Sequence, residues 1–167
     1  AVRRYFDSRE EILLGLAEQG YVDWAQALTG QIQGRDGVTS THLAHAVTTT
    51  LTERPLFCDL LTHVTLNLER EVTYERVRTF KFTVGAALAP LEEAITRATP
   101  LTSAQTNDLI IAVIAMTAPL WQAAHPAETL TRLYAEEPSL AHIGIDFAPT
   151  LTRLLTALCD GMTMAHR

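Results

Sequence analysis

The chain has 167 residues and a mass of 18.4 kDa, with 47% apolar and 19% charged residues. This size and balance suit one compact globular domain and exclude disordered and collagen-like chains. The net charge is −6, but the first nine residues, with Arg3, Arg4 and Arg9 against Asp7, carry +2 and leave −8 for residues 10–167. Because nucleic-acid affinity depends on basic groups that neutralise phosphates, the acidic body is not expected to bind nucleic acid by itself.

Two further features limit the classes of protein to which this chain can belong. Cys58 and Cys159 lie far apart without a Cys-x-x-Cys spacing, so we expect both to be reduced and structural. The longest apolar run, Leu109 to Trp121, would span about 20 Å as a helix, against about 30 Å for the hydrocarbon core of a bilayer. The opening residues also lack the pattern of a secretion signal, and we expect no membrane-spanning segment.

The hydrophobic pattern predicts an all-α fold, a helical bundle. Apolar residues recur at spacings of three and four, and alternation in twos never lasts long enough for a sheet. Ser8 and Glu11 form a capping box that starts a helix through about Leu28, and Gly30, Gly34 and Gly37 mark the loop after it. Further helices are expected at about 39–53, 55–69, 73–98, 103–124, 128–135 and 146–163.

Two of these helices carry special expectations. In the long helix at 73–98, Pro90 removes a hydrogen bond, so we expect a kink near residues 86–89, or two helices in place of one. The helix at 103–124 is apolar nearly all round, so both of its sides should be buried. Such a helix either runs through the centre of the domain or meets a second copy of the protein.

Motifs for catalysis or metal binding are missing from the sequence. It has no Gly-x-Ser-x-Gly elbow, Gly-rich phosphate loop, His-Glu-x-x-His pair or Glu-x-x-His pair. His42 and His45 are spaced to share a helix face, but two ligands without a nearby carboxylate make a weak metal site, and an exposed or capping role is the competing interpretation. We therefore expect no enzyme activity, no metal and no cofactor.

The most specific motif is the opening stretch Ala1 to Leu13. It resembles the end of the helix-turn-helix in the TetR family of bacterial transcriptional regulators, with Phe6 at the Phe position, Asp7-Ser8 as the turn and Arg9 at the Lys position. Arg3 replaces the family's usual first Tyr, a change that keeps phosphate binding possible. The resemblance implies that residues 1–8 end a DNA-binding domain and that residues 9–167 form a ligand-binding and dimerisation domain. It further implies contacts from Arg3, Tyr5 and Arg9 to the DNA backbone.

The same resemblance implies a function. The protein would be a cytoplasmic homodimer and a repressor, released from operator DNA when a small-molecule effector binds among the helices. Operator binding would need further residues ahead of Ala1, because the first helices of the DNA-binding head are absent from the sequence. Two alternatives remain open: a helical protein–protein interaction module without a ligand, and an enzyme on an all-α scaffold, which would need a cleft with close titratable groups.

Residue types suggest where the ligand and the second subunit would bind. Aromatic, flexible and polar side chains on the expected helices are candidates for the ligand site, with plain core packing as the competing interpretation: Trp24, Phe57, Leu60, His63, Asn67, Phe80, Lys81, Met116 and Trp121. His63 and Asn67 would orient a ligand or satisfy each other, and Lys81 would pair with an anionic ligand or lie at the surface. The expected dimer interface lies on the two late helices: Leu109, Val113, Leu120, Leu151, Leu154, Leu155 and Leu158.

Overall fold

The computed structural model describes residues 8–143 and 145–164, and these residues form helices and no strand, which confirms the all-α class. The elements in chain order are α1 (Arg9–Ile32), α2 (Ser40–Thr52), α3 (Pro55–His63), the π-helical segment η2 (Val64–Leu68), α4 (Tyr74–Ala98), α5 (Ser103–Ala124), α6 (Glu128–Glu136), the 3-10 segment η3 (Pro138–Ile143) and α7 (Phe147–Met164).

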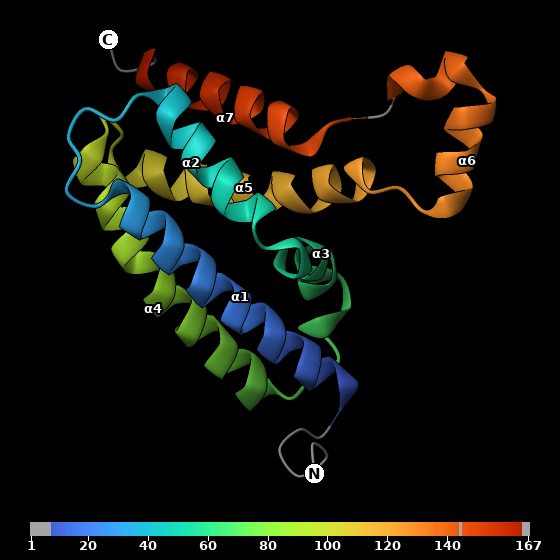
Figure 1. The fold of residues 1–167 in the computed structure, drawn as a ribbon. Helices are drawn as coiled ribbons and strands as arrows, with labels where there is room; N and C mark the ends of the chain where they lie inside the picture. Colours follow the sequence, from blue (N-terminus) through green and yellow to red (C-terminus); the bar gives the residue numbers. More distant parts are fainter. Residues whose placement is uncertain (1–7, 144, 165–167) are drawn as a thin grey trace.

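The helices form two packed groups that share α5 and α3. Along one side α1 lies against α4, and along the other α2 lies against α7 (Figure 1). Helix α5 contacts α3, α4 and α7, while α3 also packs on α1. The α6–η3 segment stands away from this body and contacts only itself among the described elements.

Four helices begin at a side-chain cap, and the cap at Ser8 is the one expected above from the sequence. Ser8, Thr39, Thr73 and Thr102 each accept a hydrogen bond from the backbone amide three residues later, which satisfies one of the free donors of the first turn. At Thr102 a complete capping box is present. Pro55 is the first residue of α3, where its missing N–H costs nothing.

Two expected boundaries differ in the structure, and one expected alternative is excluded. Helix α1 continues through Gly30 to Ile32, and the turn is made by Gly34 and Gly37, whose φ angles of 76° and 65° favour glycine. Helix α4 is one helix, so the alternative of two helices is wrong. Pro90 is tolerated there on an exposed face, where water can satisfy the carbonyl that loses its partner. The expected helix at 55–69 changes into η2 after His63.

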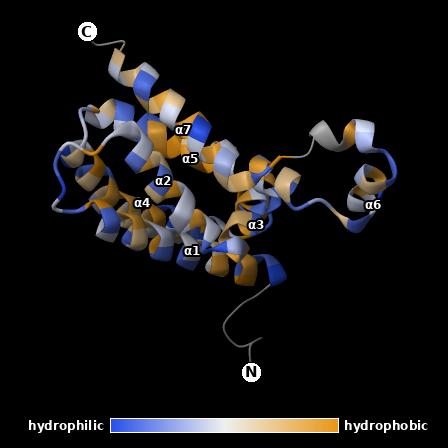
Figure 2. Ribbon diagram, turned by 45° about the horizontal axis from the view of Figure 1, so that its top comes forward, coloured by the Kyte–Doolittle hydropathy of each residue, from blue (hydrophilic) through white to orange (hydrophobic). Residues whose placement is uncertain are grey.

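Large side chains fill the interior between the two groups, and hydrophobic residues gather on the facing sides of the helices (Figure 2). Trp24 on α1 and Phe80 on α4 are 1% and 2% exposed. The expectation that both sides of α5 are buried is wrong for the single chain. Val113 is 2% exposed, whereas Ile111 is 57% exposed.

Helix α5 also bears on the membrane question. The apolar run from Leu109 to Trp121 was expected to be too short to cross a membrane. It lies within a helix of 22 residues that is long and apolar enough to do so by length and composition. No other helix among the described residues meets this criterion. Here α5 packs against three other helices of the bundle. Helix α5 is therefore rich in apolar residues because it packs in the bundle on one side, while apolar residues on its other side are exposed.

Candidate ligand pocket

Helices α1 and α5 and the α3–η2 segment line an open hollow of about 500 Å³ on the side of the bundle, which we call the α5 pocket. This volume lies within the range of small-molecule sites. Its lining residues are Tyr21, Leu61, Thr62, Val64, Leu66, Ile111, Ile114, Ala115, Ala118 and Pro119. The lining is mostly apolar and carries no ionised side chain.

Close approach of α1 and α3 fixes one wall of the α5 pocket. A Cβ at Gly20 would lie 2.4 Å from Cδ2 of Phe57, so only glycine permits this approach. The neighbouring Tyr21 packs its ring edge-on against Phe57, with ring centroids 4.9 Å apart. Because Tyr21 lines the pocket and lies in the middle of α1, the pocket contacts the helix that begins at Arg9.

The π-helical segment η2 forms the second wall. It supplies Val64, which is buried, and Leu66, which is 65% exposed at the edge of the pocket. Single turns of π-helix are rare and occur often at functional sites. Beside this segment, Oγ1 of Thr62 and Oδ1 of Asn67 are buried and have no hydrogen-bond partner among the described residues. Such orphaned polar atoms are uncommon in folded proteins. Both are closed off from the pocket, and Asn67 does not line it, so a molecule in the α5 pocket does not reach them.

The ionisable groups in and near the α5 pocket are either uncharged or paired. Burial raises the pKa of Tyr21, and the nearby Glu69 carboxylate raises it further, so the phenol stays protonated at physiological pH. The Glu69 charge is itself paired with Lys81 at 2.7 Å. No lining residue therefore offers a free charge to a ligand.

A comparison with known protein families identifies the family to which this helical bundle belongs. The sequence matches the family described as "Tetracyclin repressor-like, C-terminal domain" over residues 18–166, nearly the whole chain. The chain belongs to this family. Its TetR-like C-terminal domains are parts of transcription regulators, which confirms the family expected from the sequence, although the opening residues 1–17 lie outside the matched range. No curated protein matches the chain.

None of the nine ligand residues expected from the sequence lines the α5 pocket of this TetR-like domain. Most are buried in the core, or partly buried against it: Trp24, Phe57, Leu60, Phe80, Met116 and Trp121. Lys81 is at the surface and paired with Glu69, which matches the competing interpretation. His63 is exposed, and because Oδ1 of Asn67 has no partner, that atom does not accept a hydrogen bond from His63.

Trp121 has a structural role in the TetR-like domain. Its indole Nε1 donates a hydrogen bond of 3.0 Å to Asp59, and its ring packs edge-on against Phe147. These contacts join α5 to α3 and α7, which explains why a large aromatic residue stands at this position.

The expected DNA contacts and the histidine pair are only partly visible. Arg3 and Tyr5 lie outside the described residues, and Arg9 is the exposed first residue of α1. His42 and His45 are exposed, and His45 lies 3.4 Å from the Thr49 hydroxyl. Within residues 8–143 and 145–164, no group of three or more His, Cys, Asp or Glu residues could hold a metal ion.

The expected dimer residues divide into two groups in the structure. Leu109, Val113, Leu151 and Leu155 are at most 2% exposed and belong to the core of the single chain, so they are not available to a second subunit. Leu120 and Leu158 are half-buried against the core, and Leu154 is 39% exposed. The open apolar faces of α5 and α7 are instead formed by these residues: Ile111 and Ala115 on α5, and Leu154, Ala157 and Gly161 on α7. We call them the outer faces.

Proposed function

We propose that this TetR-family domain is the sensor and dimerisation part of a cytoplasmic transcriptional repressor, which leaves its operator DNA when a small molecule fills the α5 pocket. The observation that carries the proposal is the position of Tyr21. It lines the pocket and belongs to the same uninterrupted helix that begins at Arg9, where the DNA-binding head would be attached.

The mechanism is a shift between two populations. A ligand that favours one arrangement of the heads over the other by about 3 kcal/mol changes operator affinity about a hundredfold. In this scheme residues 1–8 end the helix-turn-helix, and Arg3, Tyr5 and Arg9 hold the DNA backbone without reading sequence. The operator would be bound by two copies related by a two-fold axis, joined through the outer faces of α5 and α7. Because Ile111 and Ala115 also line the α5 pocket, the second copy would cover that edge of the pocket.

The pocket is tested by filling it. Ala118 lines the α5 pocket, and Ala118→Phe places a ring in the space meant for the ligand. Compounds that raise the melting temperature of the wild-type chain should lose this effect in Ala118→Phe, because a ligand at about a hundred times its dissociation constant adds about 2.7 kcal/mol of stability. The matched control is Ala86→Phe on the exposed face of α4, which should respond like the wild type.

The regulatory step needs the gene product that carries the complete DNA-binding head. There, the same compounds should release a labelled operator fragment in a gel-shift assay, and Ala118→Phe should stay bound. Stabilisation by compounds that persists unchanged in Ala118→Phe would contradict the proposed site.

A second candidate function is a protein–protein interaction module without a ligand. It is favoured by α6, which has no buried residue and exposes Leu130 and Leu133 on its apolar side. In that case the α5 pocket stays empty in every assay, and removal of the α6 apolar side chains abolishes binding of a partner protein.

A further inference from the structure

The α6–η3 segment, residues 128–143, which we call the arm, packs against no other described element of its own chain. Helix α6 has no buried residue and contacts only η3, which follows it (Figure 1). Its nine residues fall short of the length, about 12–15 residues, below which an isolated helix is marginal in water. Because its own chain offers no surface to hold it, a folded α6 calls for a surface outside the chain.

Helix α6 has an apolar side suited to such a surface. Leu130 and Leu133, three residues apart, share one side of the helix and are 43% and 39% exposed. On the opposite side Arg132 pairs with Glu136 at 2.8 Å, and both side chains are exposed. A division into an apolar and a charged side is typical of a helix that lies on a protein surface.

The position of the arm in the chain favours a second copy as the partner. The arm connects α5 to α7, so it leaves one of the two helices that carry the outer faces and leads into the other. Of the five outer-face residues, only Ile111 and Leu154 are large. A stable interface buries about 800 Å² per subunit and takes about 20–30 residues from each. Leu130 and Leu133 double the number of large exposed apolar side chains that a dimer through α5 and α7 could bury.

Two-fold symmetry predicts where the arm would lie. Helices α5 and α7 run across the molecule, while α1 begins at its lower end, where the DNA-binding head would be attached (Figure 1). Two heads that face the same DNA need an axis along the direction from the α5–α7 pair to the heads, so α5 pairs antiparallel with its copy. The end of α5 in one subunit, and the arm that follows it, then lie near the start of α5 in the other.

An exposed apolar side chain is present at that place. Gln105, near the start of α5, donates a hydrogen bond of 2.7 Å to the Met162 carbonyl, so the last turn of α7 lies beside the start of α5. Met164 in this last turn is 71% exposed. The start of α5 and the end of α7 therefore offer an apolar contact to an arm that arrives from a second copy.

From these positions we infer that the arm of each subunit packs on the end of α7 in the other, with Leu130 and Leu133 against Met164. The inference rests on the dimerisation that is part of the proposed function. It adds a contact that is separate from the outer faces and that each dimer makes twice. The arm of the single chain is open, and the second copy covers it.

Sedimentation equilibrium of the 167-residue chain tests the arm. Leu130→Ser/Leu133→Ser should raise the dissociation constant of the dimer at least about tenfold, because four leucines lose their apolar contact in each dimer. Met164→Ser should also raise it. The core is untouched, so the melting temperature of the dilute monomer should not change. The matched control is Leu16→Ser/Leu56→Ser, which removes two leucines that are 44% and 56% exposed on α1 and α3, and it should dimerise like the wild type.

Cross-linking tests the pairing of residues. Leu133→Cys chains and Met164→Cys chains are mixed, allowed to exchange subunits and treated with a short bismaleimide. The mixture should give cross-linked dimers, whereas each variant alone should give few, because the antiparallel arrangement places like positions at opposite ends of the dimer. Cys58 and Cys159 are buried and should not react.

Proteolysis gives a third measurement. In the dilute monomer α6 opens easily, so trypsin cleaves after Arg132. Cleavage at this site should slow as the protein concentration rises and the dimer forms, and it should stay fast at all concentrations in Leu130→Ser/Leu133→Ser.

The outcomes separate this inference from the proposed function. An unchanged dimer in Leu130→Ser/Leu133→Ser, or equal cross-linking in the mixture and in the single variants, overturns the arm contact and leaves dimerisation through the outer faces standing. A different protein that binds α6 without competing with the dimer also overturns it, in favour of the interaction module. A wild-type chain that stays monomeric at about 100 μM contradicts the dimer itself, and release of operator DNA decides the sensor role separately.

Discussion

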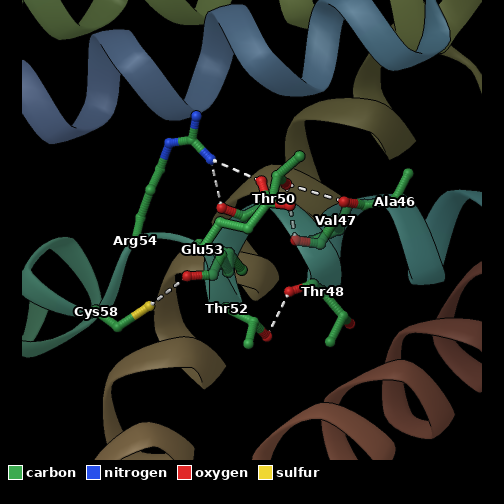
Figure 3. A network of polar contacts seen from close by, with 9 residues as sticks. Ala46, Val47, Thr48, Thr50, Thr52, Glu53, Arg54 and Cys58 are labelled. Atoms are coloured by element: carbon green, nitrogen blue, oxygen red, sulfur yellow. Dashed lines mark hydrogen bonds and ion pairs between the residues drawn. The ribbon is translucent and has the colours of Figure 1, made fainter.

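At the scale of single residues, the end of α2 shows how a polar network closes a helix. The last carbonyls of a helix have no donors of their own. Here Arg54 donates to the Thr50 carbonyl at 2.7 Å, and the Cys58 thiol donates to the Leu51 carbonyl at 3.4 Å (Figure 3). The two side chains come from the turn and helix that follow, so they tie α2 to α3.

We expect the hydrogen bond from Arg54 to contribute more to the stability of the fold than a surface ion pair does. Arg54→Met should lower the free energy of unfolding by about 1–2 kcal/mol, because a partly buried carbonyl loses a charged donor. Urea unfolding measures this. The control is Arg132→Met, which removes an exposed pair with Glu136 and should cost less than about 0.5 kcal/mol. Equal losses in the two variants would contradict the capping role.

The two cysteines predict how stability depends on alkaline pH. Burial raises the pKa of Cys58 to about 12 and that of Cys159 to about 11, with the adjacent Asp59 and Asp160 carboxylates adding to the shift. In the unfolded chain a thiol titrates near pH 8.5. The folded state therefore holds these protons more tightly, and the stability they contribute is complete below about pH 8.5 and is lost as the pH rises towards the folded values.

We expect the free energy of unfolding to fall between about pH 9 and 11 by up to about 1.4 kcal/mol per pH unit for each thiol. Denaturant titrations over this range measure the slope. The double variant Cys58→Ala/Cys159→Ala should show a flatter decline, with Tyr21 titrating in both proteins. Identical slopes would show that the thiols do not cause the decline.

At the scale of elements, the starts of α1, α2 and α5 were predictable because a side chain caps each of them, whereas α3 and α6 have no side-chain cap. Ser8, Thr39 and Thr102 signal a start through their own hydroxyl groups, whatever they pack against. Helix interiors and ends were less predictable. Gly30 stays helical although it is exposed and nothing packs against it, and the π-helical turn after His63 has no signal in hydrophobic spacing.

The position of the α5 pocket could not be predicted from the sequence, for a related reason. Aromatic residues such as Trp24, Phe57 and Phe80 were chosen for their chemistry, but large side chains fill the interior. A cavity forms where small ones such as Ala115 and Ala118 leave space, and the sequence pattern does not show which small residues face a void. The two prolines inside helices were visible, yet only the structure places Pro119 on a pocket wall.

The isolated position of α6 gives a prediction for this element. With no buried residue, it should open locally at little cost, so trypsin should cut first after Arg132. Mass spectrometry of early fragments identifies the site. Arg132→Gln should remove the early cut without changing the melting temperature, and a first cut at Arg97 instead would show that α6 is protected in solution.

At the scale of the whole molecule, the outer faces of α5 and α7 carry exposed apolar side chains. On α5 the apolar Ile111 is 57% exposed, and on α7 Leu154 is 39% exposed. Small residues, Ala157 and Gly161, lie beside Leu154 and permit another helix to approach closely. These features favour helix-on-helix packing with a second copy of the chain.

Sedimentation equilibrium should therefore show a dimer at micromolar concentration. Ile111→Glu and Leu154→Glu should each shift it towards monomer, because a carboxylate would be buried in the apolar contact. Leu16→Glu is the control, since Leu16 is 44% exposed on α1, outside the two outer faces. A dimer that tolerates both outer-face variants would place the interface elsewhere.

The unbroken course of α1 has a geometric consequence. From Tyr21 to Arg9 the helix rises about 18 Å, so a tilt of about 5° at the tyrosine moves the arginine by about 1.6 Å. In a two-fold pair the displacements add to about 3 Å, set against the roughly 34 Å that separate successive major grooves on one side of DNA. In the proposed scheme, a straight helix of this length would let a small molecule in the α5 pocket shift the two DNA-binding heads relative to each other while every helix stays folded.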